Sequence, residues 1–286
     1  ADGGQTPWSG NPWIGRGFTD HIDFAVGDVR LKDRKRFHCL FDNAVLDGLK
    51  HQPKLKLSQA AQRERKLLGA AAYFSFRSSL AENVANAKIF LKGLLNGRID
   101  RGLSVGALRD ALRVGAPMLL HYLWRRRIYN PADLGVELRL TCEQLPVAES
   151  GIRLRSERDV FGMPMVDMDW RISGGEIETL AFLGEAVAGY LRDAGLAEVE
   201  LRPALAARDP AFVAEFLDAN HQIGMARMAS SPARGVVDAH LRVHGVANLH
   251  VAGAAVFPSA GFANPTFTAL ALGLRLAERL TQERAR

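Results

Sequence analysis

Cysteine is scarce in this sequence of 286 residues, which contains only Cys39 and Cys142. The two lie far apart and form no Cys-x-x-Cys pair, so they indicate neither a disulfide framework nor a zinc ribbon. We expect both thiols to be free or buried. Their small number leaves the compartment open but favours the cytoplasm over the periplasm.

Long hydrophobic runs are also missing. The longest, from about Val114 to Trp124, is stopped by three arginines at 125–127 and is too short to cross a bilayer. We therefore predict no transmembrane segment. A buried helix end is the ordinary interpretation of this run, and contact with a membrane surface is the alternative. The chain starts Ala-Asp-Gly-Gly, without Met or an apolar targeting segment, as expected if a leader was removed or if this is an internal piece of a longer chain.

A strong excess of one charge is absent as well. The formal net charge is +6, and no dense basic face carries interleaved aromatic residues. Nucleic-acid binding is therefore not predicted. Hydrophobic residues make up 48% of the chain and charged residues 24%, which is enough apolar material for a sizeable core.

The spacing of apolar residues predicts a mixed fold. Alternation predicts strands at 21–30, 136–143, 151–155, 165–170 and 241–251. Helical spacing and capping residues predict helices within 58–130, over 176–194, from Asp209-Pro210 to about 219, and from Asn264-Pro265 to about 280. Ser79 with Glu82 forms a capping box inside the first of these stretches, and a further helix is expected from Ser104. The predicted class is α+β, an antiparallel sheet with packed helices.

Several short motifs follow one another in a characteristic order. They are Gly15-Arg-Gly-Phe-Thr-Asp-His21, His221-Gln-Ile-Gly-Met-Ala-Arg-Met228, Leu241-Arg-Val-His-Gly-Val-Ala-Asn-Leu249 and Gly261-Phe-Ala-Asn-Pro-Thr266. In this order the chain resembles the C-terminal, substrate-binding half of the glucose-methanol-choline (GMC) family of FAD-dependent oxidoreductases. The Asn-Pro-Thr is most similar to the branch of sugar enzymes such as pyranose oxidase. Met225 departs from the family's usual Thr.

This resemblance implies how the chain is organised. Residues 1–30 would connect from an FAD-binding domain, 31–130 would be a helical segment, 131–220 the substrate-domain sheet and helix, and 221–286 the catalytic segment with a strand and helix that contact FAD. No Gly-x-Gly-x-x-Gly follows a strand; the nearest candidate, Gly15-Arg-Gly17, continues into Phe-Thr-Asp with no helix behind it. Such a loop is what holds the FAD pyrophosphate. The Rossmann-like FAD-binding part is therefore expected on another polypeptide, either a separate subunit or the N-terminal half of the same chain.

The resemblance also assigns roles to single residues. His221 would be the base that takes the hydroxyl proton, and Asn264 would hydrogen-bond the substrate oxygen while hydride passes to flavin N5. Gly253 and Ala254, placed after a predicted strand, would allow close approach of FAD. A helix beginning at Asn264, Pro265 and Thr266 would direct unpaired N–H groups at the flavin. The substrate would be a small-molecule alcohol, namely a sugar, glycoside or polyol.

Other interpretations stay open at this point. The chain could be a non-catalytic accessory or carbohydrate-binding subunit that keeps the fold, or a fragment without an independent role. His221 could simply cap a preceding helix, and Gly253 could be an ordinary glycine at a strand end. Gly102-Leu-Ser-Val-Gly106 has the form of a hydrolase elbow but no buried strand before it. His240 and His244 lie in a predicted strand that would not direct both rings at one ion, so no metal site is predicted.

Overall fold

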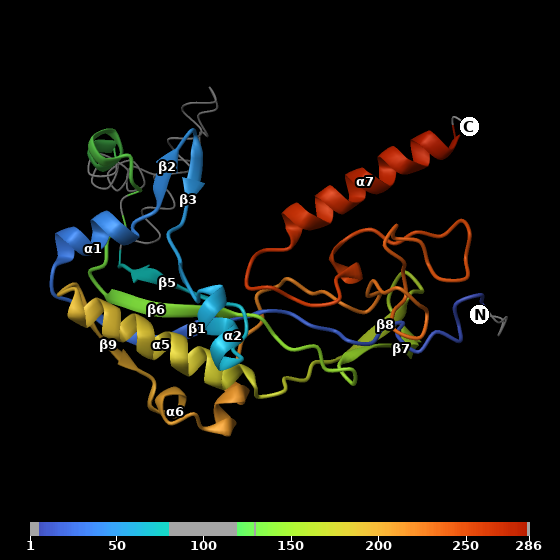
Figure 1. Ribbon diagram of the computed structural model, residues 1–286, viewed down its shortest axis with the longest axis horizontal. Coiled ribbons are helices and arrows are strands. Elements are labelled where there is room, and N and C mark those ends of the chain that lie inside the picture. The colour runs from blue at the N-terminus through green and yellow to red at the C-terminus, as the bar shows by residue number, and fades with distance from the viewer. Residues whose placement is uncertain (1–5, 80–118, 129, 285–286) are drawn as a thin grey trace.

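In the computed structural model, residues 6–79, 119–128 and 130–284 are described. Their centre is a five-stranded antiparallel sheet with strand order β4-β5-β6-β1-β9. Its strands are β1 (Ile22–Leu31), β4 (Leu55–Lys56), β5 (Ala70–Arg77), β6 (Gly135–Cys142) and β9 (Ala197–Leu201). Strands that lie far apart in the sequence, between residues 22 and 201, therefore meet in one sheet (Figure 1).

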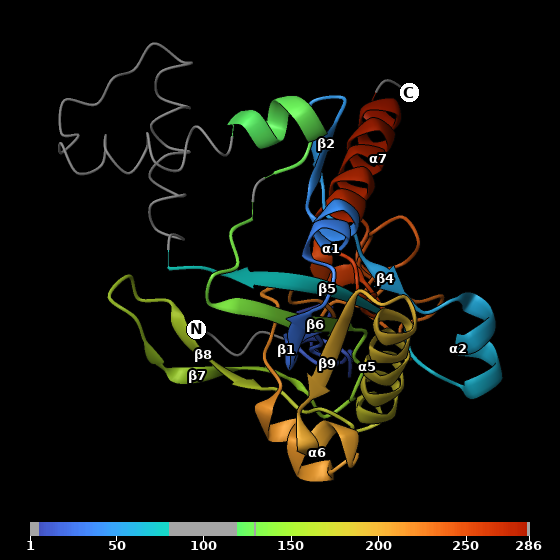
Figure 2. The ribbon, with the colours of Figure 1, turned by 90° about the vertical axis from the view of Figure 1, so that its left-hand side faces the viewer.

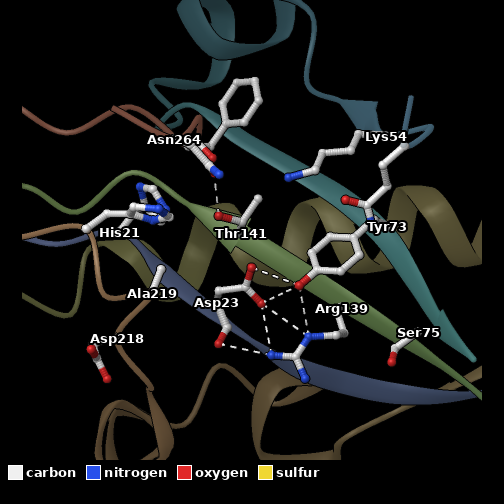
Figure 3. A pocket seen from close by; sticks show the side chains of 13 residues that line it. His21, Asp23, Lys54, Tyr73, Ser75, Arg139, Thr141, Asp218, Ala219 and Asn264 are labelled. Carbon is white, nitrogen blue, oxygen red and sulfur yellow. Dashed lines mark hydrogen bonds and ion pairs between the residues drawn. The ribbon is translucent and has the colours of Figure 1, made fainter. Parts of the chain in front are cut away.

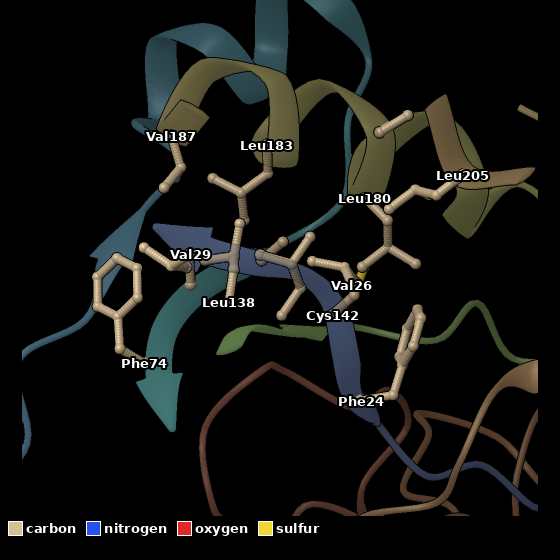
Figure 4. Packing of buried hydrophobic residues seen from close by; sticks show 14 of the residues in the cluster. Phe24, Val26, Val29, Phe74, Leu138, Cys142, Leu180, Leu183, Val187 and Leu205 are labelled. Carbon is tan, nitrogen blue, oxygen red and sulfur yellow. The ribbon is translucent and has the colours of Figure 1, made fainter. Parts of the chain in front are cut away.

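One face of this sheet is covered by helix α5 (Glu176–Asp193), as Figure 2 shows. The helix buries a stripe at helical spacing, made of Ile177, Leu180, Leu183, Val187 and Leu191. Against this stripe the strands place Phe24, Phe74, Leu138, Leu140 and Cys142, all of them buried (Figure 4). This is the main hydrophobic core.

The other face of the sheet is polar. Because side chains alternate along a strand, the neighbours of those core residues point away from α5. In the paired register Asp23 lies opposite Thr141, and Arg139 lies opposite Tyr73. One set of strand positions thus builds the core, and the interleaved set is left to line a site.

Smaller elements surround the sheet. They are α1 (Arg34–Phe41), the hairpin of β2 (Ala44–Leu46) and β3 (Leu49–His51), α2 (Gln59–Arg65), α6 (Pro203–Ala206) and the 3-10 helix η1 (Pro210–Glu215). A second region holds the hairpin of β7 (Gly151–Arg158) and β8 (Pro164–Asp169), the short 3-10 helix η2 (Ala254–Val256) and helix α7 (Thr266–Arg284). Its small core contains Val236, Val237, Leu241, Val243 and Val256. None of the described helices is long and apolar enough to span a membrane.

The predicted strands at 21–30, 136–143, 151–155 and 165–170 are confirmed, and so is the helix over 176–194. Asp209 caps the next helix as expected, since its side chain accepts the N–H of Ala211, but that element is a short 3-10 helix ending at Glu215. Ser58 caps α2 in the same way through the N–H of Ala61.

The prediction of helices throughout 58–130 is wrong for residues 70–77. This Ala-Ala-Ala-Tyr-Phe-Ser-Phe-Arg segment is strand β5, which pairs along its whole length with β6. The alanines suggest a helix locally, but Ala70 and Ala72 pack into the core beneath α5, and burial in the sheet overrides propensity. The Ser79–Glu82 capping box, the helix expected from Ser104 and the Gly102–Gly106 segment lie wholly or partly outside the described residues.

Two further interpretations are corrected by the structure. Residues 119–125 are helical, but Leu119 and Trp124 are 56% and 87% exposed, so this end of the apolar run is not buried. Residues 241–251 form turns joined by isolated bridges, because Leu241 and Gly245 adopt positive φ angles of 66° and 79° and interrupt the extended backbone. Consequently Gly253 and Ala254 do not follow a strand.

Candidate active site

A cavity of about 460 Å³ opens on the polar face of the sheet (Figure 3). Asp23, Tyr73 and Arg139 line it from the strands, and His21 lines it from the position just before β1. Two later segments border it through Asp218, Ala219, His221, Phe262 and Asn264. The structure thus brings His221 and Asn264, which are far apart in sequence, into one cavity. Gly253, Ala254, Pro265 and Thr266 do not belong to its lining.

His221 is held by a neighbouring histidine. Its Nδ1 lies 2.9 Å from Nε2 of His21, and the two ring centroids are 4.7 Å apart. The Asp20 carboxylate, which is fully buried, accepts the backbone N–H of His21 at 2.6 Å and that of His221 at 3.0 Å. His221 lies beyond the end of η1 at Glu215, so the interpretation of His221 as a helix cap is wrong.

The backbone around the histidines is fixed by a close crossing of two segments. The N–H of Thr19 donates to the carbonyl of Ile223, and the N–H of Ile223 donates back to Thr19, at 3.0 and 2.8 Å. At Gly224, where φ is +87°, a Cβ atom would come within 1.9 Å of the Gly17 carbonyl oxygen. The segment Gly15-Arg-Gly17 therefore serves backbone packing between chain segments, and no phosphate-binding loop is formed there.

The electrostatics of the pair depend on burial. Desolvation lowers the pKa of His21 below its usual value, and the nearby Asp20 carboxylate offsets part of that effect. His21 is therefore neutral at pH 7.

A second polar cluster spans three strands and was not predicted from the sequence. The Tyr73 hydroxyl donates to the Asp23 carboxylate at 2.7 and 2.8 Å, and Arg139 binds both groups, through Nη2 to Asp23 at 2.9 Å and through Nε to the Tyr73 oxygen at 3.0 Å. The available signal was a polar residue at the outward position of each alternating strand. Strand order and register, which bring these positions together, are not visible in the sequence.

We expect this cluster to keep Tyr73 protonated in alkaline solution. Burial and the Asp23 carboxylate raise the pKa of Tyr73 to about 12, above the ordinary value of about 10. Because the folded state holds this proton more tightly, its stabilising contribution is complete below pH ~10 and is lost as the pH rises toward ~12. An ultraviolet titration of phenolate should show one late step that is missing in Tyr73→Phe. A titration that is identical in the two proteins would contradict the prediction.

Asp20, His21 and His221 also place one potential metal-ligand atom each within 4.8 Å of one another. However, both Asp20 oxygens already accept backbone N–H groups. Two nitrogens on one tetrahedral zinc ion would stand roughly 3.3 Å apart, whereas the two ring nitrogens are 2.9 Å apart. This geometry favours a shared proton over a shared cation.

The histidines at 240 and 244 have separate partners. Nε2 of His244 lies 3.2 Å from the Ala229 carbonyl oxygen, and the backbone N–H of His240 donates to Asp238. The expectation that the chain binds no metal stays a prediction.

Helix α7 begins slightly later than expected. Its first N–H to carbonyl bond runs from Ala269 to Pro265, so Pro265 rather than Asn264 occupies the cap position. Asn264 immediately precedes the helix and lines the cavity. The N-terminal end of α7, where helical N–H groups lack intrahelical acceptors, is therefore adjacent to the cavity.

The chain was then compared with known proteins. Residues 146–273, which include His221 and Asn264, match the family model of the C-terminal part of GMC oxidoreductases. This segment is a GMC oxidoreductase domain. GMC oxidoreductases use FAD, as the resemblance had implied.

Relatives of the GMC domain include sugar-modifying enzymes. The chain is 30% identical over 133 residues to paromamine 6'-oxidase of Streptomyces fradiae, which covers 46% of this chain and 23% of that protein. It is 26% identical over 150 residues to the fructose dehydrogenase large subunit of Gluconobacter japonicus, covering 52% of this chain and 26% of that one. The matched segments thus span about a quarter of the length of these relatives.

The fold of the GMC domain is also found in solved structures. An FAD-dependent oxidoreductase from Chaetomium thermophilum superimposes with a TM-score of 0.52 at 16% identity, over 97% of this chain and 50% of that chain. The α+β class with an antiparallel sheet is therefore confirmed.

Two features of the described residues fit FAD, although they do not form a complete site for it. Gly253 is half-buried with φ +116°, and a Cβ atom there would meet nothing within 4 Å, so the backbone faces open space. The start of α7, beside the cavity, offers N–H groups without intrahelical acceptors. Within the described residues no strand leads through a glycine loop into a helix in the manner of a dinucleotide-binding site.

Proposed function

We propose that this GMC domain forms the substrate-binding part of an enzyme that oxidises a CH–OH group of a sugar, glycoside or polyol. The observation that carries the proposal is the meeting of His221 and Asn264 in one polar cavity on the open face of the sheet. When bound, FAD supplies the hydride acceptor, at flavin N5. Gly253, Ala254, Asn264, Pro265 and Thr266 would contact it.

Two residues of the chain itself account for removal of the hydroxyl proton and for orientation of the substrate. His221 takes the hydroxyl proton, which suits an imidazole whose ordinary pKa is near neutrality. Asn264 hydrogen-bonds the substrate oxygen and fixes the direction of the C–H bond. These two contacts make His221 and Asn264 the catalytic residues of the proposal.

The polar lining supports a substrate with several hydroxyl groups. Asp23, Tyr73 and Arg139 form a rigid set of acceptors and donors on the cavity wall, and Thr141 and Ser75 add hydroxyl groups. A polyol can satisfy such groups, whereas a purely apolar alcohol would leave them desolvated at a cost. The relatives, a paromamine oxidase and a fructose dehydrogenase, support the same class.

Helix α7 supports a partner for this domain. Leu272 and Leu276 pack on the smaller core, but Phe267, Leu270 and Leu274 form a second stripe that is 84%, 69% and 63% exposed. A contiguous exposed apolar stripe is typical of an interface, and this one starts beside the cavity. The FAD-binding polypeptide, as a separate subunit or as the N-terminal half of the same chain, is the proposed occupant of this interface.

Both cysteines are free, and the cytoplasm stays the proposed compartment.

The test is anaerobic reduction of the purified native protein. A denaturing gel and intact mass should reveal the polypeptide that supplies the FAD site, and the visible spectrum should show bound flavin. Sugars, aminoglycosides and polyols should bleach that flavin faster than simple aliphatic alcohols do. A flavin that no alcohol reduces, or a chain without flavin, would support the accessory-subunit alternative instead.

A further inference from the structure

We infer that His21 is a positioning residue that fixes the proton of His221 on Nδ1 and thereby leaves Nε2 of His221 as a lone pair facing the cavity. His21 was not a predicted site residue. The direction of this hydrogen bond rests on the function proposed above, in which Nε2 of His221 takes the hydroxyl proton.

The geometry admits one proton between the rings. Nδ1 of His221 and Nε2 of His21 are 2.9 Å apart, which is a normal hydrogen-bond distance. Two lone pairs or two N–H groups facing each other at that distance would repel, so one ring donates and the other accepts. The question is which ring does which.

The function proposed above decides the direction. A base that takes a proton on Nε2 holds the proton of its neutral ring on Nδ1, and Nδ1 of His221 is the atom that faces Nε2 of His21. His21 is 4% exposed, and burial disfavours a second proton on its ring. Nε2 of His21 can therefore accept the hydrogen bond from Nδ1 of His221.

The scaffold keeps this arrangement independent of a ligand. Asp20 holds the backbone of both histidines, and its own N–H donates to the buried Gln144 side chain at 3.1 Å. The crossing of residues 17–19 with 223–224 fixes the two segments against each other. The rings are therefore positioned before any substrate enters, as preorganised catalytic groups are.

The consequence for His221 is specific. With Nδ1 occupied by a proton directed at His21, the only basic nitrogen of the neutral ring is Nε2, on the side of the cavity that His221 lines. When Nε2 takes a proton from a hydroxyl, the charge is stabilised through Nδ1–H by a neutral acceptor. A carboxylate does this in hydrolase triads and raises the basicity of the imidazole. A neutral histidine fixes the tautomer with a smaller effect on basicity.

Several other charged groups lie near the histidine pair. Asp20 and Asp23 act on His21 from its own segment. Asp218 borders the cavity beside His221, and Lys54 and Arg139 border it from the sheet. Among these, Asp20 accepts backbone N–H groups, and Asp23 is bound to Tyr73 and Arg139. His21 is thus the ring partner of His221.

The first test reads the protons directly. Nitrogen NMR of the native protein labelled with 15N-histidine should show His221 with hydrogen on Nδ1 and a bare Nε2, with its signals identified by their loss in His221→Asn. Finding the hydrogen of His221 on Nε2 would overturn the inference. This readout needs no substrate turnover, so it is decided even if the protein oxidises no alcohol.

The second test uses a matched pair of variants. In His21→Gln the side-chain oxygen can take the place of Nε2 as acceptor, whereas His21→Phe fills the same space without one. Flavin reduction should fall about 10-fold or more in His21→Phe, with a changed pH profile and little change in KM, and should stay within about 3-fold of wild type in His21→Gln. Equal losses in two folded variants, or no loss in either, would overturn the positioning role.

Discussion

Replacing His221 with alanine is expected to slow flavin reduction by an alcohol by two or more orders of magnitude, while FAD stays bound. The reason is that the variant lacks the His221 imidazole, which lines the cavity and is hydrogen-bonded to the buried ring of His21. The backbone should hold, because Asp20 binds the N–H of residue 221 and not its ring. Stopped-flow reduction under anaerobic conditions, read beside the visible spectrum, measures both quantities.

His240 offers the matched control for this experiment. It is an exposed histidine whose backbone N–H is held by Asp238, and it lies outside the cavity. His240→Ala should reduce its flavin at the wild-type rate. If His221→Ala also kept the wild-type rate, His221 would have no part in the chemistry and another base would have to be sought.

The substitution Gly224→Ala is expected to cause the largest loss of stability. The added methyl group would lie 1.9 Å from the Gly17 carbonyl oxygen and 2.9 Å from its carbon, which are backbone atoms. The positive φ of +87° adds strain of about 1–2 kcal/mol for any residue with a side chain. Because the clash can be relieved only by separating segments 17–19 and 221–225, we expect a total loss of about 3 kcal/mol or more. Urea unfolding of the native protein measures it.

Gly245→Ala separates the two causes. Its φ is +79°, close to that of Gly224, but a Cβ atom there would meet nothing within 4 Å. It should therefore cost only the conformational part, about 1–2 kcal/mol. Equal losses in the two variants would mean that the crossing of the segments yields easily, and that the histidine pair is held less firmly than the geometry implies.

Much of the fold could be predicted from local patterns. Alternation identified β1, β6, β7 and β8, and a stripe of apolar residues identified α5, because each of these elements buries one face. Strand β5 was missed because its alanines favour a helix, and the run at 241–251 was misread because positive φ angles at Leu241 and Gly245 do not show in hydrophobic spacing. Burial in the sheet decided the structure of β5, and backbone turns decided that of residues 241–251.

The same distinction between local patterns and long-range contacts applies to the residues of the site. His221 and Asn264 could be named from the resemblance, because each lies in a motif of recognisable order. His21 lies in such a motif too, but its contact with His221 joins residues two hundred positions apart. The Asp23–Tyr73–Arg139 cluster needs the strand register of three strands. Such contacts arise from topology and carry no local signal.

The alternation of the strands has a consequence for redesign. Positions 24, 74, 138 and 140 bear the core, whereas 23, 73, 75, 139 and 141 line the cavity. A mutant library confined to the second group would vary the cavity wall while leaving the packing beneath α5 as it is. Lineages in which the ligand of this cavity changes can therefore diverge along every second residue of these strands, and the tolerance of each strand to change should itself alternate.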